Sequence, residues 1–149
     1  MINLEALTLL QDENLSAEAL DKLSTEEDPF VRARVAAHLN TSAETLVKLS
    51  TDETPLVKQF VDEHINTPTE TLIELNKDSD LAYWIAGNPN TPIDLLCNFS
   101  NHENENVRSS LSVNPKTPVH VLNKLLKDED EGVREAVMKN PNTPKDQVE

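Results

Sequence analysis

The most constraining feature of the sequence is an internal repeat of 26 residues that covers almost the whole chain. Leu or another apolar residue recurs six and nine places after the start of each unit, and an apolar pair four residues apart recurs near its end. Stacked repeat proteins show such a period, because one unit buries its apolar face only against its neighbours. The units start at intervals of 26, 26, 24, 26 and 26 residues, at Asn14, Asn40, Asn66, Asn90, Lys116 and Asn142.

The repeat predicts one domain over residues 1–149. Residues 1–13, with Leu4, Leu7 and Leu10 at helical spacing, are expected to form an N-terminal capping helix. The third unit is two residues short, and the missing residues fall in its middle loop. The predicted units are 14–39, 40–65, 66–89, 90–115 and 116–141, followed by a partial unit at 142–149.

The nine prolines support the alignment, because all of them fall in three columns of the repeat. They open the first helix of a unit, open the second helix, or end the unit. Thr67, followed by Pro68 and by Glu70 three places later, is predicted to form a capping box at the start of a first helix. One unit is therefore two short helices, and the first, of about nine residues, depends on packing and could tighten to a 3₁₀ turn in part.

The second helices are predicted to supply the core. Apolar residues make up 37% of the chain and aromatic residues 3%, which suits a thin, elongated core better than a single compact one. The competing interpretation is disorder, favoured by low hydrophobicity and high charge, but the regular spacing opposes it. The predicted fold class is an all-α helical-repeat solenoid without strands. The expected core residues are Val31, Val35, Val57, Val61, Ile85, Val107, Leu111, Val133 and Val137.

The motif Asn-Pro-x-Thr-Pro, followed by a Leu pair and later by Val-Arg, resembles the leucine-rich repeat variant family of bacterial proteins. The clearest matches lie at 88–92, 114–118 and 140–144, whereas the first two units lack Asn-Pro. The resemblance implies a right-handed superhelix of alternating α and 3₁₀ helices, and nothing firm about function. Some members carry an iron–sulfur cysteine cluster, whereas this chain has the single cysteine Cys97. HEAT repeats, the near alternative, have longer units.

The formal net charge of −14 limits the classes of partner. It opposes binding to nucleic acids and to anionic membranes, and it favours a basic protein surface. The alternative is that the charge only keeps the repeats in solution. We see no secretion signal and no run of 18 apolar residues, and one cysteine fits a reducing compartment, so a cytoplasmic location is expected.

Three columns are candidate sites, and each has a structural alternative. A basic column could bind phosphate or carboxylate, but internal pairing with an acidic column is the preferred prediction. A column of histidine and asparagine could bind metal, but it is predicted to satisfy backbone groups at helix ends. The basic residues are Arg32, Lys58, Arg108 and Arg134, and the acidic residues are Glu26, Asp52, Asp78 and Asp128. The third column contains His38, His64, Asn88, Asn114 and Asn140.

The residues predicted to bind a partner are a cluster of aromatic side chains with one arginine and the acidic turns between the helices. Trp84 could instead fill the gap left by the short unit, and the acidic turns could be a solvated edge. The aromatic group is Phe60, Tyr83 and Trp84, with Arg34 in the same column as Phe60 and Trp84. The acidic group is Glu26, Glu27, Asp52, Glu53, Asp128 and Asp130.

No catalytic motif is evident, and Gly87 and Gly132 are the only glycines, which excludes a glycine-rich phosphate loop. We therefore predict a non-enzymatic protein–protein interaction scaffold that uses its concave face and acidic edge and needs no metal or cofactor. The alternatives are an acidic nucleic-acid mimic that inhibits a DNA- or RNA-binding protein, and a structural fragment of a longer repeat array. The C-terminal end, where the sixth unit stops, is expected to contact another chain, for example in a homodimer, or to continue in a missing extension.

Overall fold

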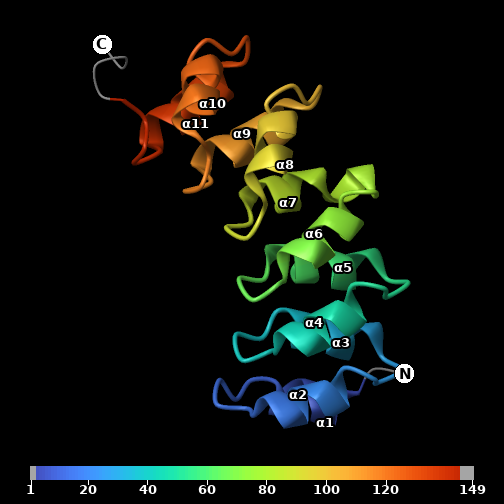
Figure 1. Cartoon of the computed structure of the whole chain (residues 1–149). Helices are drawn as coiled ribbons and strands as arrows, with labels where there is room; N and C mark the ends of the chain where they lie inside the picture. The colour runs from blue at the N-terminus through green and yellow to red at the C-terminus, as the bar shows by residue number, and fades with distance from the viewer. Residues whose placement is uncertain (1–2, 145–149) are drawn as a thin grey trace. The chain divides into compact units, whose positions relative to one another are not determined.

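The computed structural model describes residues 3–144, and these residues form helices joined by short loops, with no strand (Figure 1). The predicted all-α helical-repeat class is therefore confirmed. The chain divides into two compact units, Met1–Leu75 and Asn76–Glu149. The helices of the first unit are α1 (Leu4–Leu9), α2 (Ala17–Leu23), α3 (Pro29–Ala36), α4 (Ala43–Leu49), α5 (Pro55–Glu63) and α6 (Thr69–Leu75). Those of the second are η1 (Ser79–Leu81), α7 (Ala82–Gly87), α8 (Ile93–Phe99), α9 (Glu105–Val113), α10 (Val119–Leu125) and α11 (Glu131–Lys139).

In the N-terminal unit, α3 packs between α1 and α5, while α2 and α4 contact these helices from the other layer. The C-terminal unit repeats the pattern, with α9 between α7 and α11. All nine core positions predicted in the second helices are at most 2% exposed, so that prediction is confirmed. The N-terminal helix α1 buries Ala6, and Leu10 directly after it is also buried, whereas Leu4 is 71% exposed.

The first helices differ from the prediction in length and in type. Each is an α-helix of seven residues rather than about nine. The 3₁₀ segment lies instead in the second helix of the short third repeat, where η1 precedes α7. This repeat also contains the boundary between the two compact units, after Leu75.

The threonine of the Thr-Pro pair does not cap α8 or α10, where proline takes the N-cap position, and it has a different role. Thr117 Oγ1 donates a hydrogen bond to Leu111 O over 2.6 Å, so it satisfies the end of the preceding helix. Pro118 then occupies the N-cap position of α10 without a side-chain cap. The same backward bond recurs at the start of each repeat after the first and is made by Thr41, Thr67, Thr91, Thr117 and Thr143.

Where a first helix does have a side-chain cap, the cap lies one residue later than predicted. Ser42 accepts from the amide of Thr45, at the position that proline takes in later repeats. The second helices follow the prediction more closely. Asp28 caps α3 ahead of Pro29, and Thr54 precedes α5 without a side-chain cap bond.

Candidate functional site

Two of the four residues of the basic column, Arg32 and Arg108, pair with the acidic column as predicted, whereas Arg134 bonds to backbone carbonyls and Lys58 forms no pair with the described residues. Arg108 donates from Nε and Nη2 to the two carboxylate oxygens of Asp128, each over 2.8 Å, and from Nη1 to the carbonyls of His102 and Glu103. Arg32 and Asp52 make the same forked pair. The side chains of Asp52 and Asp128 are each only 8% exposed, so these two predicted partner-binding residues are engaged inside the fold.

The polar column forms a ladder along the ends of the second helices. Asn114 donates from Nδ2 to Ala86 O and Asn88 O, and its Oδ1 accepts from the amide of Lys116. Asn140 repeats the pattern one unit later. These bonds confirm that the column satisfies backbone groups.

The histidines of the column make equivalent bonds, which define their protonation. His64 Nδ1 accepts from the amide of Asn66, so Nε2 carries the proton and donates to His38 O over 3.0 Å. Burial lowers the pKa of His64 below its ordinary value. A second proton, on Nδ1, would face the amide N–H of Asn66. The folded chain therefore favours the neutral form of His64.

Replacing His64 with Asn is expected to reduce the loss of stability in mild acid. The unfolded chain, with a histidine pKa of about 6.5, binds more protons than the folded chain as the pH falls, so the contribution of His64 is complete above about pH 7 and decreases below it. An asparagine at position 64 can make the backbone bonds that Asn114 makes in the same column, and its side chain does not titrate. Urea unfolding between pH 7.5 and 5 tests this, with the exposed His120→Asn as control, and an unchanged slope in His64→Asn would contradict it.

The predicted partner-binding residues lie in separate places. Arg34 and Phe60 belong to the N-terminal unit, whereas Tyr83 and Trp84 form an edge-to-face pair in the C-terminal unit, with ring centroids 4.6 Å apart. Tyr83 is exposed and Trp84 is half-buried. Of the acidic group, Glu27 and Glu53 are exposed, Glu26 accepts a hydrogen bond from Asn3, and Asp130 caps α11.

An apolar groove of about 470 Å³ lies on the N-terminal unit, across α1, α3 and α5. Its floor includes the small, buried Ala33 of α3, and its walls include Phe30 and Phe60. Arg34 is its one polar lining residue. The complete lining is Leu7 from α1, Phe30, Ala33 and Arg34 from α3, and Leu56 and Phe60 from α5.

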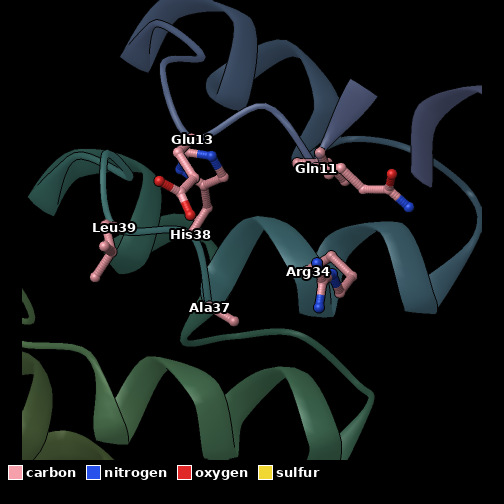
Figure 2. Close-up of a pocket in the computed structure, with 7 residues that line it drawn as sticks. Gln11, Glu13, Arg34, Ala37, His38 and Leu39 are labelled. Carbon is pink, nitrogen blue, oxygen red and sulfur yellow. The ribbon is translucent and has the colours of Figure 1, made fainter. Parts of the chain in front are cut away.

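The groove is bordered at both ends by polar hollows that share a residue with it. Beyond Phe30 lies a hollow whose lining includes Glu5, Glu26 and Glu27. Beyond Arg34 lies a second hollow, of about 340 Å³, between the segment after α1 and the carboxyl end of α3 (Figure 2). The second hollow is lined by Leu10, Gln11, Glu13, Arg34, Ala37, His38 and Leu39.

Phe30 and Leu56 were not among the predicted site residues, although a signal was present in the sequence. Both occupy the column just before the first core valine of a second helix. In the C-terminal unit the same column holds Asp80, Asn106 and Gly132, all exposed. In the N-terminal unit it holds large apolar side chains that are 55% (Phe30) and 38% (Leu56) exposed. Large apolar side chains occupy this column in two repeats only, and a polar residue or glycine occupies it in the other three, so the apolar residues mark a local surface rather than a requirement of the fold.

The negative charge is concentrated on the unit that carries the groove. Residues 1–75 hold 15 Asp and Glu against five Lys and Arg, a formal charge of −10 out of the total of −14. Three of the five basic side chains pair with acids of the same unit: Lys22 with Glu18, Arg32 with Asp52, and Lys48 with Asp21. Arg34 makes no hydrogen bond or ion pair with the described residues.

The only cysteine of the chain lies beside a histidine. Cys97 is half-buried and has Sγ 3.7 Å from Nε2 of the exposed His120, a proximity that the sequence did not reveal. No group of three or more potential metal ligands gathers in residues 3–144. None of the described helices is long and apolar enough to span a membrane.

Comparisons of the chain with protein-family models, curated proteins and solved structures found no match. The resemblance to the leucine-rich repeat variant family therefore stays a prediction. The predicted homodimer contact depends on residues that include 145–149, which lie outside the described residues. Within the described part of the last repeat, Val133 and Val137 are fully buried and Met138 is 48% exposed.

Proposed function

We propose that this chain is a non-enzymatic protein-binding repeat whose binding surface is the apolar groove of the N-terminal unit. The observation that carries the proposal is the exposure of Phe30 and Leu56 in a column that holds Asp, Asn or Gly in the C-terminal repeats. Neither side chain is needed to fill the core, because Val31 and Val57 beside them are fully buried. Large apolar side chains around a depression are typical anchoring surfaces for another protein.

The proposal refines the interaction surface predicted from the sequence. Arg34 and Phe60, two of the predicted partner-binding residues, line the groove, and Glu26 and Glu27 border it. Asp52 and Asp128 have structural roles instead. The alternative of a nucleic-acid mimic receives less support, because a mimic needs a row of free carboxylates and gains nothing from an apolar groove.

Site-specific crosslinking tests the proposal. A photoreactive phenylalanine analogue at position 60 is expected to trap a protein of defined mass in lysate of the source cell. The same analogue at Ser110, which occupies the equivalent column of the C-terminal unit, is expected to trap none. The adduct is expected to disappear in the double variant Phe30→Asp, Leu56→Asp and to persist in Ile73→Asp, a control on α6 that is 47% exposed in the wild type.

The outcomes separate the proposal from its rivals. No adduct at position 60, or equal adducts at positions 60 and 110, would contradict binding at the groove. An adduct that forms only at low salt and survives the double variant would favour the acidic mimic, because screened charge would then carry the binding.

A further inference from the structure

The lining of the groove limits how a partner's backbone can be accommodated. Arg34 is the single polar residue among the six that line it, and the unit offers no strand edge within its described residues. An extended peptide would therefore find almost no partners for its backbone amides and carbonyls in the groove. A helix satisfies its own backbone bonds and presents only side chains, so it is the secondary structure that the groove accommodates.

The two ends of the groove differ in charge. At the Phe30 end, the described lining of the adjoining hollow contains acids, including Glu5, Glu26 and Glu27, and no basic residue, in a unit of formal charge −10. At the other end, the side chain of Arg34 lines both the groove and the hollow beyond it, which contains one acid, Glu13, and Arg34 makes no ion pair with the described residues. Basic side chains of a partner would face the first end and a carboxylate would face the second, because complementary potentials set orientation as well as attraction.

We infer that the groove receives an amphipathic helix of another protein, with apolar residues on one face, basic residues at one end and a carboxylate placed to pair with Arg34. This inference rests on the proposed function and specifies the chemistry of the partner. The apolar side chains occupy the space over Ala33, between Phe30 and Phe60. The basic end lies over the hollow formed by Glu26 and Glu27.

Selection from a random library of 16-residue peptides displayed on their own mRNA tests the inference with the full chain as bait. Binders are kept only if they fail to bind the Phe30→Asp, Leu56→Asp variant. The expected sequences carry apolar residues at i, i+3 or i+4, and i+7, with Lys or Arg clustered at one end and one Asp or Glu. When the Arg34→Glu variant is the bait instead, the selected peptides are expected to carry Lys or Arg in place of that acid.

Binding measurements then check the pairing directly. Arg34→Glu is expected to weaken a peptide selected on the wild type by roughly tenfold, and Ile73→Asp is expected to leave its affinity unchanged. A peptide in which the acid is replaced by Lys is expected to bind Arg34→Glu better than it binds the wild type.

Three results would overturn the inference. Groove-dependent peptides that are acidic, or extended and rich in proline, would show that the partner chemistry is wrong while the groove still binds protein. If a protein is crosslinked at position 60 but no groove-dependent peptide is selected, the groove binds protein and the inferred helical partner is wrong. Self-association that is abolished by Phe30→Asp, Leu56→Asp would assign the groove to a second copy of the chain.

Discussion

Replacing Arg108 with Ala is expected to lower the free energy of unfolding by about 3–5 kcal/mol, the range for breaking a buried ion pair from one side. The variant leaves the carboxylate of Asp128, which is 8% exposed, without its forked donor. It also removes the bonds from Nη1 to the carbonyls of His102 and Glu103. Hydrogen bonds from Arg108 keep the pKa of Asp128 below its ordinary value, so the variant loses a contribution that the wild type retains down to about pH 4.

Arg134→Ala is the matched control for this prediction. Arg134 stands one repeat later in the same column and, within residues 3–144, donates only to the carbonyls of Asp128 and Glu129. Its removal is expected to cost about 1–2 kcal/mol, because no buried carboxylate loses its forked donor. Urea unfolding followed by circular dichroism measures both variants. Equal losses for Arg108→Ala and Arg134→Ala would show that the ion pair contributes little.

Replacing Asn114 with Ala is expected to cost about 3 kcal/mol, since each of three hydrogen bonds of a buried side chain contributes about 1 kcal/mol. The lost bonds join α9 to Ala86 and Asn88 of the previous repeat and to the amide of Lys116. Amide hydrogen exchange at the ends of α7 and α9 is expected to accelerate in this variant.

The variant Asn114→His tests whether Asn114→Ala loses stability through its lost backbone hydrogen bonds or only through lost packing. His38 and His64 occupy this column in the N-terminal unit and make the corresponding bonds, with Nε2 as donor and Nδ1 as acceptor. The histidine variant is therefore expected to recover much of the stability at pH 7.5. A histidine variant no more stable than the alanine variant would contradict the interpretation of the column as an interchangeable backbone-bonding position.

The repeat period was enough to predict the fold class and the buried positions, because each core position recurs in every unit. The Arg–Asp pairing could be predicted for the same reason, since both columns repeat together. The hydrogen-bond partner of the threonine in the Thr-Pro pair could not be predicted, because its side chain can cap the next helix or bond back to the previous one. Only the observed backbone, with Thr117 facing Leu111 O, separates the two.

The candidate site was predicted only in part. Arg34 and Phe60 attracted attention because their column varies between repeats, and they do line the groove. Phe30 and Leu56 were missed because the repeat spacing does not show whether an apolar residue beside a core valine is buried or exposed. Their exposure depends on which side of α3 and α5 faces α1 and α4, which the spacing alone does not determine.

The most direct test of the central claim is the affinity of the crosslinked partner for three forms of the full chain, measured by isothermal titration calorimetry. The Phe30→Asp, Leu56→Asp variant is expected to bind at least roughly tenfold more weakly than the wild type, about 1.4 kcal/mol or more. Ile73→Asp is expected to match the wild type. If all three forms bind the partner with the same dissociation constant, the groove across α1, α3 and α5 is not the binding surface.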